Sequence, residues 1–294
     1  MRLTFSPRSK DEEPPREEEP PAEPFTQPQL TGTQQRVLDE LRGRGISTIG
    51  FDELVGDASL WNELQADMDA FVERAVEQIP PGMTRPEQKD QFLIRRFRPN
   101  KQGEALEQAR LATDGPWLRF AVGSPLLDVV NAYRRLQTKL VDYDHWYTVP
   151  FSEDYERVSS QQWHRDPEDL HVVKVFLYFS DVDEEAGPFE YVPGSTEGGP
   201  YGSLFPWGEG KSWYPSVRKF DRRVPKSERL LVTAPAKTIV VCDTSGFHRG
   251  GHAHSKPRIL STHTYVSRGS TWGRRFEVDW RDGDLSDAAR FALS

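Results

Sequence analysis

A histidine and a carboxylate two positions apart, just before a long apolar run, constrain this chain more than any other feature. His164 and Asp166 flank Arg165, and residues 171–179 are rich in β-branched and aromatic side chains. On an extended backbone, residues i and i+2 point to the same side, so both side chains can contact one metal ion. An acidic turn, Gly187-Pro188 and a short apolar segment follow. This order predicts strand, turn, strand, turn.

A third candidate ligand lies in the other histidine-rich segment. The apolar run of residues 238–242 leads into a loop that carries His248, and Arg258 follows ten positions later, before the predicted strand of residues 259–266. Two histidines and one carboxylate bind one face of an octahedral ion and leave three positions open, as in non-heme Fe(II) oxygenases. We therefore predict that His164, Asp166 and His248 form an open, catalytic metal site.

These segments resemble a known enzyme family. The His-x-Asp motif, the distal histidine and the later arginine occur together with DVDEEAGPFEYVPGS and TIVVCDTSGFHRGG. In this combination they resemble the phytanoyl-CoA dioxygenase branch of the Fe(II)/2-oxoglutarate-dependent dioxygenases, over roughly residues 142–267. His-x-Asp alone is a weak signal, whereas all four elements in order, each at the end of a strand-like run, are specific.

The resemblance implies a role for each matching residue. His164, Asp166 and His248 would bind Fe(II), and Arg258 would bind the distal carboxylate of 2-oxoglutarate, which a planar guanidinium fits bidentately. With O2, such an enzyme hydroxylates an unactivated C–H bond of a small molecule and releases succinate and CO2. Relatives that halogenate leave the position of the carboxylate ligand free for a halide. Because Asp166 fills it here, hydroxylation is favoured.

Two more residues are candidates for binding the co-substrate. Lys174 lies on the polar face of the central predicted strand, opposite an all-apolar face, and Gln162 is in register with His164. Many relatives have a hydroxyl residue two positions after the arginine, where this chain has Leu260. Thr262 is the hydroxyl residue that shares the strand face of the arginine.

The predicted elements indicate a mainly β protein with flanking α helices. We expect a double-stranded β-helix, the jelly-roll of cupins, with the N-terminal helices packed on one sheet. One domain is expected over residues 31–294, with a helical flank at about 31–141 and a jelly-roll core at about 91–98 and 142–280. Within the flank, residues 59–79 repeat apolar side chains at helical spacing, and Ser124-Pro125 starts a helix that runs to about residue 141.

Other polar residues have two interpretations. Arg95, Arg96 and Arg98 alternate on a predicted edge strand, where exposure to solvent is favoured over contact with the cavity. The connection at residues 196–228 is either a substrate-binding lid or an ordered surface insertion. Three further histidines are expected in the core or in a surface loop rather than on the metal: His145, His252 and His254.

Composition excludes several classes of partner. Residues 1–30 form an acidic tail rich in Pro and Glu, predicted to be disordered, which is either a docking segment or a solvated leader. The net charge of −8 and the lack of a basic cluster argue against nucleic acid. The single cysteine excludes an intrachain disulfide, and no apolar run predicts a membrane span or a signal peptide. A cytoplasmic protein is expected, with its oligomeric state open.

Three alternative functions use the same ligands. A zinc hydrolase would not need Arg258, and a metal-binding cupin without oxygenase activity would not turn over 2-oxoglutarate. An oxygenase that desaturates its substrate or closes a ring shares the chemistry of a hydroxylase until the last step, so the sequence does not separate the two. The substrate is expected to be a small molecule, and its identity is not specified by any motif.

Overall fold

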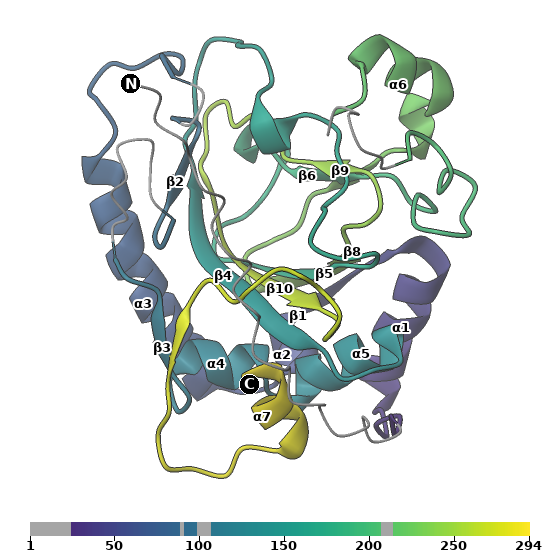
Figure 1. Ribbon diagram of the computed structural model, residues 1–294. Helices are drawn as coiled ribbons and strands as arrows, with labels where there is room; N and C mark the ends of the chain where they lie inside the picture. Colours follow the sequence, from purple (N-terminus) through teal and green to yellow (C-terminus); the bar gives the residue numbers. More distant parts are fainter. Residues whose placement is uncertain (1–24, 89–90, 99–106, 207–213) are drawn as a thin grey trace, which may run out of the picture.

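A six-stranded antiparallel sheet lies at the centre of the structure (Figure 1). The computed structural model describes residues 25–88, 91–98, 107–206 and 214–294. The sheet order is β1-β8-β5-β10-β4-β2. Its strands are β1 (Ile46–Gly50), β2 (Leu93–Arg95), β4 (Lys139–Thr148), β5 (Val173–Tyr178), β8 (Thr238–Asp243) and β10 (Arg258–Val266). The long strands β4 and β10 pair along almost their whole length.

Helices cover one face of this sheet. Figure 1 shows α1, α2, α4 and α5 together on one side of it. The helices are α1 (Gly32–Arg44), α2 (Phe51–Leu54), α3 (Ala58–Glu77), α4 (Pro116–Ala121), α5 (Ser124–Arg134), α6 (Val217–Arg223) and α7 (Asp287–Ala292). The predicted packing helix is confirmed as α3, which buries Trp61, Met68 and Phe71 in the main apolar cluster. Val173, Val175 and Leu177 of β5 enter the same cluster, so the apolar face of this strand packs on the helical layer.

The opposite face of the large sheet looks toward a smaller sheet. This three-stranded sheet contains β6 (Phe189–Tyr191), β7 (Leu230–Val232) and β9 (His248–Arg249), in the order β7-β6-β9. Side chains from both sheets form a second apolar cluster, which includes Phe176 and Leu260 from the large sheet and Phe189 and Tyr191 from the small one. Two antiparallel sheets with flanking helices are therefore present, as the sequence predicts.

Some predicted boundaries are wrong, for local reasons. The helix predicted for residues 124–141 ends at Arg134, because Arg135 adopts a left-handed conformation with φ 53°. The side chain of Asn131 then accepts hydrogen bonds from the backbone N–H and the hydroxyl of Thr138, and β4 starts at the next residue. The strand predicted for residues 270–280 is reduced to β11 (Glu277–Asp279), which pairs in parallel with β3 (Arg110–Ala112).

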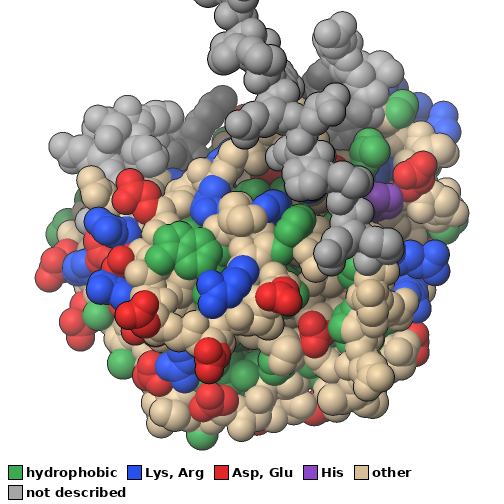
Figure 2. All heavy atoms as spheres, turned by 60° about the horizontal axis from the view of Figure 1, so that its bottom comes forward, with side chains coloured by type: hydrophobic (Ala, Val, Ile, Leu, Met, Phe, Trp, Pro, Cys, Tyr) green, Lys and Arg blue, Asp and Glu red, His purple; other side chains and the backbone are tan. Residues whose placement is uncertain are grey.

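Other predicted segments fall partly outside the described residues. Most of the acidic tail lies there, and so do Trp207 and Trp213 of the long connection; the described remainder of that connection contains α6 and the 3-10 turn Lys226–Glu228. None of the helices in the described ranges is long and apolar enough to cross a membrane. On the face drawn in Figure 2, Lys and Arg side chains alternate with Asp and Glu, so no large basic patch forms on that face.

Two histidines lie in the core between the sheet and the helices. His145 and His263 are both fully buried, on neighbouring strands, and their rings pack against Trp117 and other aromatic side chains. The prediction that His145 is a core residue is confirmed. Burial lowers the pKa of His263 to about 3, so this imidazole is neutral in the folded protein.

Replacement of His263 by Gln is expected to reduce the pH dependence of stability. The unfolded chain binds a proton at this histidine below about pH 6.5, whereas the folded protein does so only near pH 3, so stability is lost as the pH falls through this window. Between about pH 7.5 and pH 5.5 the loss from this group is about 1.4 kcal/mol. Urea unfolding of both proteins at the two pH values measures it, and equal losses would contradict the prediction.

Phe71→Ala is expected to lower the free energy of unfolding by about 3–5 kcal/mol, because it leaves a cavity beneath the sheet. Val76→Ala is a control on the same helix, since Val76 is 49% exposed, and it should change stability by less than about 0.5 kcal/mol. Urea denaturation of the two variants gives the comparison. Similar losses would show that α3 does not cover the core through Phe71.

Candidate metal centre

Backbone hydrogen bonds bring the three predicted ligands together. The N–H of His164 donates to the carbonyl of His248 at 3.1 Å, and the N–H of His248 donates to the carbonyl of His164 at 3.0 Å. Two residues on, the N–H of Asp166 donates to the carbonyl of Thr244 at 2.9 Å. These bonds join two segments that are far apart in the sequence, one before β5 and one after β8. As a result, one ligand atom from each of His164, Asp166 and His248 lies within 4.8 Å of the others.

Both histidines present the same nitrogen to the centre of this group. Nδ1 of His164 lies 2.8 Å from the carbonyl of Gln162, and Nδ1 of His248 lies 3.0 Å from the carbonyl of Gly246. A backbone carbonyl only accepts, so each Nδ1 carries the hydrogen and each Nε2 keeps a free electron pair. Burial lowers the pKa of His164 to about 3, and His248 adds to this effect. The ring is thus neutral, as a metal ligand must be.

Asp166 completes the group and is held as an anion. Its carboxylate oxygens lie 3.7 Å from Nε2 of His164 and 3.5 Å from Nε2 of His248. Burial by itself would raise the pKa of this carboxyl group, but Lys174 and the two histidines outweigh it and hold the pKa well below its usual range. The ammonium of Lys174 lies 2.6 Å from Asp166 and 3.7 Å from Glu168. Lys174 therefore faces the cavity, but its charge is already matched by these carboxylates.

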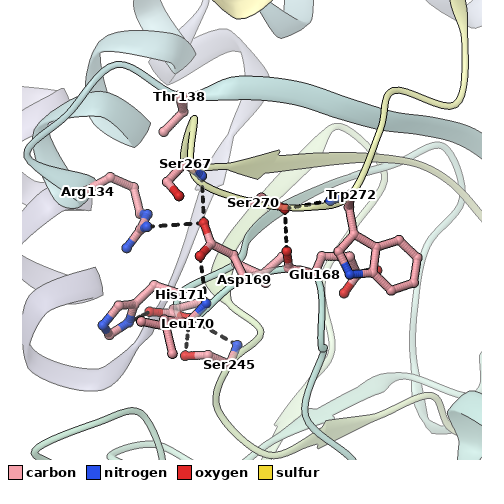
Figure 3. Close-up of polar contacts among 12 residues, drawn as sticks. Arg134, Thr138, Glu168, Asp169, Leu170, His171, Ser245, Ser267, Ser270 and Trp272 are labelled. Carbon is pink, nitrogen blue, oxygen red and sulfur yellow. Dashed lines mark hydrogen bonds and ion pairs between the residues drawn. The ribbon is translucent and has the colours of Figure 1, made fainter. Parts of the chain in front are cut away.

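The loop that carries Asp166 is anchored on both sides. Arg165 points away from the two ligands beside it and donates to the carbonyls of Ser195 and Ser245, each at 2.5 Å, while it packs on the ring of Phe247. Figure 3 shows the second anchor, where Asp169 accepts from the backbone N–H of Ser267 at 2.6 Å and pairs with Arg134 of α5 at 3.5 Å.

The same loop is tied to the segment after β10 by one more bond. In Figure 3, the hydroxyl of Ser270 donates to the carbonyl of Glu168 at 2.6 Å. Together, these contacts fix the backbone on either side of Asp166. The carboxylate is thus positioned by contacts that reach α5 and the end of β10, before any metal binds.

A cavity opens beside the three ligands, and Arg258 lies in its wall. Arg258 begins β10 and is only 5% exposed. Its Nη1 donates to the carbonyl of Gly187, but its buried Nε has no partner, and no carboxylate pairs with it within the described residues. A Cβ atom at Gly250 would stand 3.3 Å from Nη2 of Arg258, so a glycine there leaves space around the guanidinium. Burial lowers the pKa of Arg258, yet an arginine keeps its charge in proteins.

The remaining predicted residues fall both inside and outside the cavity. Thr262 lines it, on the same face of β10 as Arg258, as its strand position predicts. The side chain of Gln162 does not line the cavity, although the backbone of this residue is extended as predicted. Its amide donates to the carbonyl of Arg157 instead. His252 stacks on Tyr155 at 4.1 Å, outside the group of three ligands.

Several cavity residues were not identified from the sequence. Arg95 and Arg98 both line the cavity, and Arg96 is buried against Asp67, so the prediction that this strand exposes its arginines is wrong. β2 does lie at the edge of the sheet, where it pairs with β4, but these arginine side chains point to the cavity or into buried contacts. Asp142 and Trp146 also line the cavity from alternate positions of β4. The sequence shows that Asp142 and Trp146 lie on one face of β4 and the core residues on the other. It does not show which of the two faces lines the cavity.

Comparisons with known proteins identify the fold. No protein-family model matches the sequence, and neither does any curated protein. Among solved structures, EctD from S. alaskensis with 2-oxoglutarate and 5-hydroxyectoine is 13% identical, with a TM-score of 0.55 over 88% of this chain and 86% of that one. AviO1 from Streptomyces viridochromogenes is 16% identical, with a TM-score of 0.53 over 82% of this chain and 98% of that one.

A third similar structure is the epimerase SnoN in complex with Fe3+, alpha ketoglutarate and nogalamycin RO. It is 15% identical to this chain and has a TM-score of 0.51 over 82% of this chain and 86% of that one. At such low identities, the similarity establishes a shared fold, whereas function depends on the residues of the site.

Removal of either histidine is expected to abolish tight metal binding. Wild-type protein should bind one equivalent of Fe(II) in an anaerobic calorimetric titration, and His164→Ala and His248→Ala should each weaken binding by more than about a hundredfold, since even outer hydrogen-bond partners of ligands contribute about 10–100-fold. His252→Ala is the matched control from the same loop and should bind normally. Unchanged affinity in the first two variants would place the metal elsewhere.

Proposed function

We propose that this chain is an Fe(II)- and 2-oxoglutarate-dependent oxygenase that hydroxylates a C–H bond of a small molecule. His164, Asp166 and His248 would hold Fe(II), and Arg258 would bind the distal carboxylate of 2-oxoglutarate. Two neutral imidazoles and one carboxylate on one side of an ion suit Fe(II) and leave positions for the co-substrate and O2. This function is the one that the resemblance to the phytanoyl-CoA dioxygenase branch implies. We also infer that the chain is a single domain folded as a double-stranded β-helix.

Arg258 carries this proposal. A buried guanidinium without a counter-ion is costly, because desolvation of the charge is not compensated. It stands in the same cavity as the three ligands, and its free Nε and the space beside Gly250 fit a bidentate carboxylate. A zinc hydrolase with these ligands has no need of such an arginine. A dicarboxylate with one end at the metal and the other at Arg258 would explain both the open positions at the metal and the buried arginine without a counter-ion.

The side chains around this cavity have separable tasks. When bound, Fe(II) would activate O2, to which 2-oxoglutarate and the C–H bond of the substrate would each give two electrons; one oxygen atom would enter succinate with loss of CO2 and the other would enter the substrate. The two Nδ1–H groups, bonded to the carbonyls of Gln162 and Gly246, keep the imidazoles oriented. Lys174 keeps Asp166 ionised and in place. Phe176 and Phe189 make part of the wall apolar, which limits the access of water to the reacting groups.

The structural neighbours support the choice of cofactors. EctD was crystallised with 2-oxoglutarate, and SnoN with Fe3+ and alpha ketoglutarate. SnoN is an epimerase, so a fold of this kind accommodates more than one outcome of the reaction. Hydroxylation is our choice because Asp166 occupies the third ligand position that a halide would otherwise take. Desaturation and ring closure use the same site and are separated from hydroxylation by analysis of the product.

Arg258→Gln is expected to abolish turnover of 2-oxoglutarate at ordinary concentrations. Loss of one partner of a buried charge pair costs about 2–5 kcal/mol, which corresponds to a KM for 2-oxoglutarate raised by at least about thirtyfold. Succinate formation is measured under air with Fe(II), ascorbate and varied 2-oxoglutarate. Arg110→Gln, at an exposed position on β3, is the matched control and should behave as wild type.

The same assay distinguishes the alternatives. His164→Ala should form no succinate at any concentration of 2-oxoglutarate, because the metal is lost, whereas Arg258→Gln should recover part of its activity as 2-oxoglutarate is raised. Wild-type protein that binds Fe(II) but neither binds nor consumes 2-oxoglutarate would overturn the proposal and favour a metal-binding cupin without oxygenase activity.

A further inference from the structure

A second cation in the cavity forms no ion pair in the described parts of the chain. Arg95, the last residue of β2, lines the same cavity as Arg258 and makes neither an ion pair nor a hydrogen bond in the described parts of the chain. Its guanidinium lies 5.0 Å from the centre of the Trp146 ring, on the neighbouring strand β4. Burial and Arg98 lower the pKa of Arg95 to about 10, against the opposite effect of Asp144 and Asp142, so the group stays charged at neutral pH.

Trp146 offers a second unused donor beside it. The indole Nε1 of Trp146 is buried and has no hydrogen-bond partner. The two residues are directly opposite each other in the pairing of β2 with β4, and both line the cavity. A buried N–H without an acceptor is destabilising, because the hydrogen bond it made with water is lost. Two adjacent donors, one of them charged and neither with an acceptor, fit an anionic group of a ligand.

No carboxylate forms an ion pair with Arg95 in the described parts of the chain, although Asp144 and Asp142 are near enough to raise its pKa. Lys174 pairs with Asp166 and Glu168, and Arg98 pairs with Asp142. Among the described residues that line the cavity, four are cations (Arg95, Arg98, Lys174 and Arg258) and three are carboxylates (Asp142, Asp166 and Glu168). Asp144, which is buried on β4 and lies 3.9 Å from Arg98, adds a fourth carboxylate beside this wall. The charges around the cavity are thus equal in number, and the two donors without acceptors, Arg95 and Trp146, are what indicate an anionic ligand.

We infer that the substrate is a small organic anion whose carboxylate or phosphate binds to Arg95 and the indole N–H of Trp146. This inference rests on the proposed function, since it assigns Arg258 to the co-substrate and Arg95 to the substrate. The body of the substrate is partly apolar, because the wall of the same cavity also contains Phe92, Phe176, Phe189 and Leu260. Arg95 is thus a specificity-determining residue: it binds the substrate and takes no part in holding the metal.

The test uses three probes of similar shape. Protein loaded with Fe(II) and 2-oxoglutarate is kept anaerobic and titrated by calorimetry with 3-phenylpropionate, phenyl phosphate and the neutral 3-phenylpropanamide. At least one anion is expected to bind about tenfold or more tightly than the amide, because a charge-assisted hydrogen bond contributes about 1.5–3 kcal/mol. The tighter of the two anions identifies the substrate as a carboxylate or a phosphate.

Substitutions assign the preference to these residues. Arg95→Gln should remove the preference for the anions over the amide and leave the affinity for the amide unchanged. Arg110→Gln should retain this preference. Trp146→Phe, which keeps an aromatic ring and removes one donor, should weaken anion binding several-fold and provides the test if Arg95→Gln does not fold. Equal binding of anions and amide by wild-type protein, or a preference that survives in both Arg95→Gln and Trp146→Phe, would overturn the inference.

Failure of the proposed function is detected separately. The loading titration reports whether Fe(II) and 2-oxoglutarate bind, and the probes are also titrated into unloaded protein. A chain that prefers the anions but does not take up 2-oxoglutarate retains the anion site and loses the proposed function. A weakened affinity for 2-oxoglutarate in Arg95→Gln would assign Arg95 to the co-substrate and contradict the inference.

Discussion

The paired backbone hydrogen bonds between His164 and His248 are the interaction on which the site depends. They join the segment before β5 to the segment after β8, and so place two imidazoles with ring centres 4.2 Å apart. The next bond along, from Asp166 to the carbonyl of Thr244, adds the carboxylate. Because each Nδ1–H is bonded to a carbonyl, both Nε2 atoms are directed to one point. The geometry needed for a metal is therefore supplied by the backbone before any ion binds.

The cavity forms because β4, β5 and β10 each have one face that packs on the helices and one face that does not. One face of each strand packs on the helices, where His145 and His263 are buried, and the other face lines the cavity. Polar groups on the cavity face that are otherwise unsatisfied include Arg258 Nε, Trp146 Nε1 and Thr262 Oγ1. A folded protein seldom leaves several buried polar atoms without partners in one place unless a ligand or water supplies them. The cavity is thus built to receive polar molecules.

The sequence was enough to select His164, Asp166 and His248 and to assign the faces of the central strand. It was not enough to place the arginines of β2 in the cavity. The spacing of His164 and Asp166, and the alternation around Lys174, are local patterns that extended backbone converts directly into geometry. The environment of Arg95 depends on which strand lies beside β2, which is a long-range pairing with no local signal. The amide of Gln162 binds the carbonyl of Arg157, a contact that its spacing to His164 does not indicate. The length of α5 was overestimated because Arg135 adopts a conformation unusual for a residue with a side chain.

The most direct test of this account is the crystal structure of the protein grown anaerobically with Fe(II) and 2-oxoglutarate. The account predicts one iron bound by Nε2 of both histidines and by the carboxylate of Asp166. One end of 2-oxoglutarate should lie at the iron, and its distal carboxylate should be paired with Arg258. An iron bound elsewhere, or a 2-oxoglutarate whose distal carboxylate lies away from Arg258, would contradict the account.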